Sequence, residues 1–143
     1  MMVEVKFYNC DHVDETTPSY VIIGARFVGQ WVFVKNRKRG TYEMPAGHID
    51  KGESAFTAAG RELMEETGAL KFVLECINTY SVEQNGSRKT GRLFYADILE
   101  MGDIEDKDEI EVRIFSSDLP DELTFPEVQG KLFLKLNTFC KDS

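Results

Sequence analysis

Residues 47–68 constrain the fold of this chain more than any other segment. Glycines at positions 47 and 52 permit sharp turns, and a periodic segment with good helix formers begins near Ser54. Gly68 follows directly after that segment, where glycine commonly ends a helix in the left-handed conformation. We therefore expect a turning loop followed by a helix over residues 54–67.

Three glutamates share one side of this expected helix. Glu62, Glu65 and Glu66 are three or four residues apart, so their carboxylates lie close together. Each like-charged pair costs roughly 0.2–0.5 kcal/mol, and negative charge in the last turn costs roughly 0.3–1 kcal/mol against the helix dipole. Bound Mg²⁺ or Mn²⁺, which prefer carboxylate oxygens, would remove both costs. A solvated acidic helix face is the alternative interpretation.

The same helix is also expected to contain an ion pair and, on a different side from the glutamates, an arc of residues that packs on a β-sheet. Arg61 and Glu65 are i, i+4 neighbours, and Glu53 stands at the start of the helix within reach of the Arg61 guanidinium. The arc expected to pack on a β-sheet carries Phe56, Ala59, Gly60, Leu63 and Thr67.

The rest of the chain contains more strands than helices. Strands are expected at residues 3–7, 20–23, 31–34, 72–82, 93–99 and 111–115, with a last helix from Pro126. The helices do not alternate regularly with the strands, which favours a layered α+β domain over a doubly wound parallel sheet. Trp31 and Tyr42 could stack on a base, with burial in the core as the alternative.

Charge and cysteine content limit the partners and the compartment. The chain has 17 basic and 25 acidic residues, a net charge of −8, which disfavours DNA, RNA duplexes and anionic membranes as partners. Its apolar runs are shorter than the roughly 20 residues that span a bilayer. Three cysteines far apart, without a CxxC pattern, are typical of free thiols in a reducing compartment. We therefore expect a cytoplasmic protein.

The glutamates belong to a longer pattern with a known counterpart. Gly47 to Ala69 matches G-x5-E-x7-R-E-U-x-E-E-x-G-U, where U is aliphatic, at every position but the last. There, Ala69 replaces a larger aliphatic residue. This pattern is the Nudix box, and residues 31–34, 43–46 and 114–120 resemble the flanking segments of the same family. The chain thus resembles the Nudix (MutT-like) hydrolases over roughly residues 20–126.

The resemblance implies both a fold and an activity. The fold is the Nudix fold, an α/β/α sandwich around a mixed β-sheet, here a single domain over residues 1–143 with the box at residues 47–69. The activity is hydrolysis of a nucleoside diphosphate linked to another group, with Mg²⁺ or Mn²⁺ as cofactor. The partner is a small-molecule nucleotide, and a homodimer is left open because many proteins of this fold dimerise.

The resemblance also assigns site residues. Glu62, Glu65 and Glu66 would bind the metal, joined by the backbone carbonyl of Ala46. Arg61 and Glu53 would form the pair that orients the loop and the helix.

One further glutamate outside the box often serves this family as a ligand or general base. Glu109 is the best-placed candidate, with Glu111 and Glu83 as alternatives. In the basic segment before the box, one of Lys35, Arg37, Lys38 and Arg39 is expected to bind a phosphate, with Lys35 and Arg37 as the named candidates and a solvated turn as the alternative.

The substrate stays open at this stage. Markers of other subfamilies are missing or incomplete, which leaves a nucleoside triphosphate pyrophosphohydrolase as the leading hypothesis, with an oxidised purine nucleotide such as 8-oxo-dGTP as a candidate substrate. The alternatives are ADP-ribose, a nucleotide sugar or a 5′-triphosphate RNA end. A nucleotide-binding module without catalysis is a third hypothesis, but the intact Arg61 and glutamates favour an enzyme.

Overall fold

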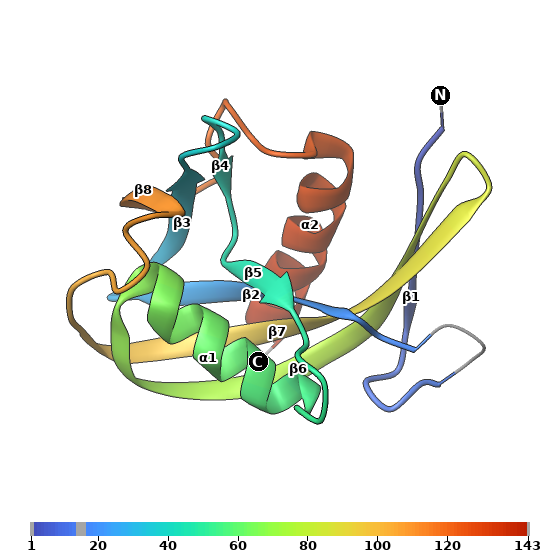
Figure 1. Ribbon diagram of the computed structural model, residues 1–143, viewed down its shortest axis with the longest axis horizontal. Helices are drawn as coiled ribbons and strands as arrows, with labels where there is room; N and C mark the ends of the chain where they lie inside the picture. Colours follow the sequence, from blue (N-terminus) through green and yellow to red (C-terminus); the bar gives the residue numbers. More distant parts are fainter. Residues whose placement is uncertain (1, 14–16, 143) are drawn as a thin grey trace.

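The computed structural model describes residues 2–13 and 17–142, which form a mixed β-sheet between two helices (Figure 1). The strands are β1 (Glu4–Tyr8), β2 (Tyr20–Phe27), β3 (Gln30–Asn36), β4 (Tyr42–Glu43), β5 (Ala46–His48), β6 (Ala69–Gln84), β7 (Ser87–Met101) and β8 (Ile110–Ser116). The helices are α1 (Ala55–Thr67) and α2 (Pro126–Asp142).

The strands of the described residues join into one sheet. Its main path runs β1-β6-β7-β2-β3-β4, while β5 pairs with β2 and β8 pairs with β3. β2 and β7 are parallel, and the remaining pairs are antiparallel. The sheet is therefore mixed, as expected.

The central strand β2 is covered on both faces. Val21 and Ile23 pack in the core cluster that contains α1, whereas Ile22 packs in the cluster that contains α2. A strand buried on both faces is uniformly apolar, which explains the unbroken run at residues 20–23. With α1 on one face and α2 on the other (Figure 1), the α/β/α sandwich is confirmed.

Two hairpins have two-residue turns with positive φ angles. Asn85 and Gly86 join β6 to β7 with φ of 55° and 77°, the residue types that this turn favours. Val28 and Gly29 join β2 to β3 with φ of 50° and 78°, although a β-branched residue such as Val28 rarely adopts a positive φ. β6 and β7 extend further than expected, and no apolar alternation marks the added residues at the ends of the two strands.

The face of α1 that was expected to pack on the sheet is buried at Ala59, Leu63 and Thr67 but not at Phe56. Ala58, Ala59 and Leu63 have no exposed surface, but the expected core residue Phe56 is 57% exposed. The small alanines bring the helix close to the sheet, which leaves room for the ring of Phe56 only at the margin, 6.3 Å from that of Phe94. The prediction that Phe56 packs on the sheet was wrong.

α2 begins at Pro126, as expected, and Leu132 and Leu136 of its apolar stripe are fully buried. The ring centres of Phe139 and Tyr95 are 5.8 Å apart.

Within residues 2–13 and 17–142, neither helix is long and apolar enough to cross a membrane. The cytoplasmic location stays a prediction.

We predict opposite effects on stability for two glycine-to-alanine changes. In Gly24→Ala the new methyl would lie 2.3 Å from Cδ1 of Leu136, so overpacking should cost about 1–3 kcal/mol. Gly130 lies inside α2, where an added methyl group would meet no such atom within 4 Å. Gly130→Ala should therefore raise the free energy of unfolding by about 0.5–1 kcal/mol. Urea denaturation of both variants measures the difference, and equal stabilities would contradict the packing of α2 on β2.

Candidate active site

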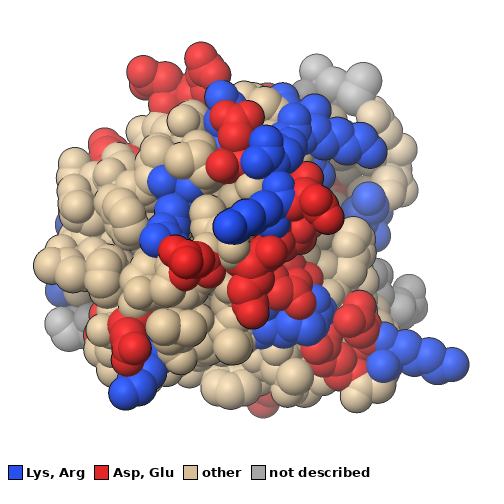
Figure 2. Space-filling view, turned by 60° about the vertical axis from the view of Figure 1, so that its left-hand side comes forward, with Lys and Arg blue, Asp and Glu red and all other residues tan. Residues whose placement is uncertain are grey.

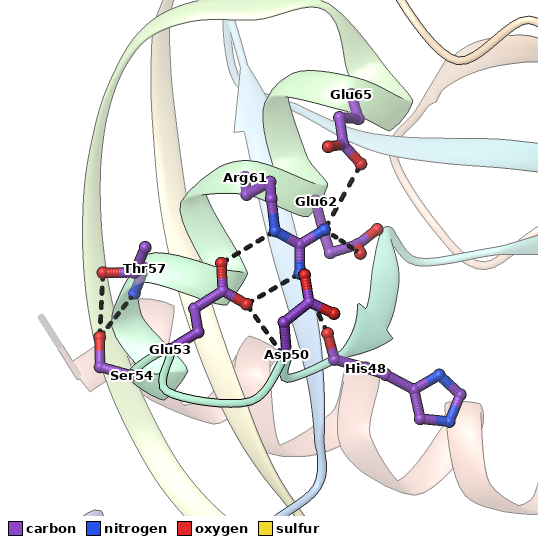
Figure 3. Close-up of polar contacts among 8 residues, drawn as sticks. All are labelled: His48, Asp50, Glu53, Ser54, Thr57, Arg61, Glu62 and Glu65. Atoms are coloured by element: carbon purple, nitrogen blue, oxygen red, sulfur yellow. Dashed lines mark hydrogen bonds and ion pairs between the residues drawn. The ribbon is translucent and has the colours of Figure 1, made fainter.

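Arg61 is the centre of the polar contacts between the box loop and α1 (Figure 3). Its Nε and Nη2 donate to the two carboxylate oxygens of Glu53, each at 2.9 Å, and Nη2 also donates to the His48 carbonyl at 3.1 Å. Nη1 donates to Glu62 at 2.7 Å and lies 3.6 Å from the carboxylate of Glu65. The guanidinium thus fastens the loop to two of the predicted metal ligands.

The ionic contact also fixes the charge of Glu53. The hydrogen bonds from Arg61, together with one from the backbone N–H of Asp50 at 3.1 Å, lower the pKa of Glu53 to about 2.

The helix α1 starts directly after this loop, where the Ser54 hydroxyl accepts from the backbone N–H of Thr57 at 3.1 Å. At the other end Gly68 has φ of 84°, so the predicted start near Ser54 and the predicted stop at Gly68 are both confirmed.

Gly47 is required by the position of Glu62. A methyl group on its Cα would lie 2.2 Å from the carboxyl carbon of Glu62, closer than any real contact. The absence of a side chain at this box position therefore lets a carboxylate of α1 pack directly against β5.

Glu66 is the most buried acid of the box, with 1% of its surface exposed. One of its oxygens accepts from the backbone N–H of Ala46 at 3.1 Å, which links α1 to β5. Burial, together with the negative charges of Glu62, Glu109 and Glu43, raises the pKa of Glu66 to about 9, although the hydrogen bond from Ala46 opposes this effect. The three box glutamates therefore do not share one solvated face.

The other two box glutamates are more accessible. The side chain of Glu62 is 12% exposed and that of Glu65 is 39% exposed. Burial raises the pKa of Glu62, while the hydrogen bond and the charge of Arg61 oppose this effect.

Of the three outer glutamates, Glu109 is the one that lies beside the box acids. Its charge contributes to the raised pKa values of Glu62 and Glu66. Burial, and then a hydrogen bond with Asp106, raise the pKa of Glu109 itself. The loop that carries it is attached to α1, because the backbone N–H of Asp106 donates to the Glu65 carbonyl at 3.0 Å.

The two alternatives have other partners. Glu111 lies 3.6 Å from the ammonium of Lys35, and Glu83 lies 3.4 Å from the guanidinium of Arg88 at the far end of β6. Both ion pairs are with basic residues outside the box.

A pocket of about 550 Å³ opens next to Glu109. Figure 2 shows basic and acidic side chains intermixed on the face turned toward the viewer. The pocket is lined by Asn36, Lys38, Arg39, Asp106, Asp108 and Glu109.

Lys35 and Arg37 are not among the lining residues. Lys35 pairs with Glu111, and Arg37 donates to the Lys107 carbonyl at 2.7 Å. Their role in phosphate binding stays a prediction.

Glu43 is an acidic residue that the sequence reasoning did not assign to the site. It is 5% exposed and accepts from Nη1 of Arg39 at 3.3 Å. Burial raises the pKa of Glu43, and the negative charge of Glu43 in turn contributes to the raised pKa of Glu66. The signal in the sequence is its position: Glu43 stands in the segment just before the box, next to Met44, Pro45 and Ala46. That position indicates the family but does not by itself show that the side chain is buried near Glu66.

The donor set fits a hard divalent cation by its chemistry. Glu62, Glu65, Glu66 and Glu109 supply carboxylate oxygens from α1 and from the loop before β8, and the pKa values of Glu62 and Glu66 are raised in part by the other acids. Among residues 2–13 and 17–142, no three such side chains are already gathered closely enough to chelate an ion, because Glu62 and Glu65 face Arg61.

Comparison with known proteins identifies the family. The sequence model of the NUDIX domain matches residues 16–134. The chain is also 32% identical to the putative 8-oxo-dGTP diphosphatase YtkD of Bacillus subtilis over 108 residues, 76% of this chain and 68% of that protein. The chain therefore belongs to the Nudix hydrolase family, whose members are generally divalent-metal-dependent.

Solved structures agree with this assignment. A mutant of the pyrophosphohydrolase BsRppH of Bacillus subtilis superimposes with a TM-score of 0.82 at 25% identity, covering 99% of this chain and 91% of that one. The NUDIX domain of NrtR from Shewanella oneidensis, crystallised with ADP ribose, gives a TM-score of 0.70 at 14% identity over 89% of this chain and 90% of that one. The second likeness supports the fold alone.

We predict that Gly47→Ala displaces Glu62 and lowers kcat/KM at least tenfold, because a misplacement of about 1 Å can cost about 100-fold. Gly60→Ala is the matched control, since its methyl would meet only the ring of Phe72 at an ordinary 3.7 Å. Circular dichroism checks that both variants are folded before activities are compared. Equal activities would show that the close approach of Glu62 to β5 is unimportant.

Proposed function

We propose that this protein is a Mg²⁺- or Mn²⁺-dependent nucleoside triphosphate pyrophosphohydrolase that converts its substrate and water to a nucleoside monophosphate and pyrophosphate. The observation that carries the proposal is the position of Glu109, which lines a pocket and is close enough to Glu62 and Glu66 to raise their pKa values, while Arg61 binds Glu53, Glu62 and the loop. The name of the Bacillus subtilis relative supports 8-oxo-dGTP as a candidate substrate.

Glu62, Glu65 and Glu66, with the carbonyl of Ala46, would hold the metal. Bound cations would neutralise phosphate oxygens, make water a better nucleophile and stabilise the leaving group. They would also allow a protein of net charge −8 to accept a polyphosphate, because they reverse the local field.

Protein groups supply the remaining functions. Arg61 and Glu53 position the loop and the carboxylate of Glu62, as their hydrogen bonds support. Glu109 acts as the general base, since its exposed side chain borders the pocket and its raised pKa makes it a better proton acceptor.

Phosphate contacts on the substrate would come from the basic turn after β3. Lys38 lines the pocket and is therefore the better-supported candidate, whereas Arg39, which also lines it, is engaged by Glu43 and the Phe125 ring. Lys35 and Arg37, which the sequence suggests, lie on the same segment and could bind phosphate at its outer side.

We predict Mg²⁺-dependent turnover in a panel of nucleoside triphosphates, oxidised purine triphosphates, ADP-ribose and nucleotide sugars, with products separated by anion exchange. Pyrophosphate and a monophosphate would support the proposal, whereas AMP and ribose 5-phosphate would assign ADP-ribose instead. Glu66→Gln should abolish turnover, and Glu75→Gln, the same change at an exposed position of β6, should not. Metal-dependent binding without any turnover would favour a binding module.

We predict that Glu109→Gln lowers kcat by about 100- to 10,000-fold, the range typical of general acid–base catalysis, with little change in thermal stability. Glu105→Gln removes the same charge from an exposed position of the same loop and should stay within about twofold of the unaltered protein. A pH–rate profile of both variants separates the roles. Full activity of Glu109→Gln would show that another group accepts the proton.

A further inference from the structure

Phe125 is an exposed aromatic side chain at the start of α2. It is 65% exposed, whereas phenylalanine is among the residues most often buried. The two aromatic residues considered from the sequence are less accessible. Trp31 is 3% exposed in the core beside α2, and the ammonium of Lys35 lies 5.8 Å from the ring centre of Tyr42.

Local backbone structure does not explain a phenylalanine at this position. Its φ is 42°, in the left-handed region that glycine and asparagine adopt most easily. Its carbonyl accepts from the backbone N–H groups of Val128 and Gln129, so it stands where a helix is usually capped by serine, threonine, aspartate or asparagine. A phenyl ring supplies no capping oxygen. The position therefore carries backbone strain without gaining burial or a cap, and such strain is typical of functional sites.

The backbone on both sides of Phe125 is fixed by hydrogen bonds. Before it, the backbone N–H of Thr124 donates to the carbonyl of Tyr42 at 2.8 Å, and the hydroxyl groups of Thr124 and Thr41 are hydrogen-bonded to each other. After it, the two hydrogen bonds to the Phe125 carbonyl fix the first turn of α2. An anchored backbone limits the positions open to the ring, which lowers the conformational entropy lost when a flat ligand binds.

Arg39 connects this ring to the pocket. Its guanidinium carbon lies 5.8 Å from the centre of the Phe125 ring, and the same side chain lines the pocket beside Glu109. Its ion pair with the buried Glu43 holds it in place. Because the ring is largely exposed despite this contact, most of its surface is open to a ligand.

From these contacts we propose that Phe125 and Arg39 form a stacking platform for the base of the nucleotide substrate. The inference rests on the proposed function and adds the part of the site that contacts the base. An aromatic ring and a guanidinium plane both stack on a nucleobase. Because every base has a π-face, stacking by itself does not discriminate between one base and another. The phosphates would then extend toward the pocket and the glutamates.

Tryptophan fluorescence tests the platform directly. Phe125→Trp should be quenched by a guanosine triphosphate analogue with a methylene bridge between the α and β phosphates, added with Mg²⁺, because a stacked base quenches indole emission. Inorganic tripolyphosphate should leave the emission unchanged. Leu134→Trp is the matched control, since Leu134 is 67% exposed on α2 and should give no quenching with either compound. Equal behaviour of the two variants would overturn the inference.

Affinity and stability together separate a binding role from a structural one. Phe125→Gly should raise the Kd for the same analogue roughly 5- to 100-fold by calorimetry, while the Tm is not lowered because glycine relieves the positive φ. Unchanged affinity in this variant, with binding by the unaltered chain, would overturn the platform alone. Failure of the unaltered chain to bind the analogue would overturn the proposed function and the platform with it.

Discussion

The guanidinium of Arg61 is the contact on which the site depends. It binds both oxygens of Glu53, the carbonyl of His48 and the carboxylate of Glu62, so one side chain joins the loop to the helix. Its planar set of donors allows this, and lysine, a point charge, could not replace it. It is also the one positive charge that the close-up shows among the acids (Figure 3), which offsets part of their mutual repulsion.

The segment before the box is clamped by both helix layers. Glu66 of α1 accepts from the N–H of Ala46, and Gln129 of α2 accepts from the N–H of Met44, each at 3.1 Å. Both acceptor side chains are buried, with 1% and 5% exposure. A hydrogen bond left unmade in such surroundings is costly, so the packing of the two helices on the sheet also sets the position of the segment that leads into the site.

Local patterns predicted much of this architecture, and long-range contacts account for what they missed. The start of α1 near Ser54 and its stop at Gly68 depend on neighbouring residues and could be predicted directly. The burial of Glu66 depends on Ala46, 20 residues away, and the position of Glu109 depends on the pairing of β8 with β3. Helical periodicity places Phe56 on the face of α1 that packs on the sheet, but the side chain is exposed. Periodicity does not show how closely a helix approaches its sheet.

Charges of both signs line the pocket, which a net charge cannot reveal. Asp106, Asp108 and Glu109 share it with Lys38 and Arg39, and the charge of Glu109 also reaches the box glutamates Glu62 and Glu66. In the absence of cations these acids would repel a polyphosphate, and two basic side chains alone give it little specificity. For the polyphosphate substrate proposed above, bound cations would remove this repulsion, so the electrostatics of the site support the metal dependence that is general in the family.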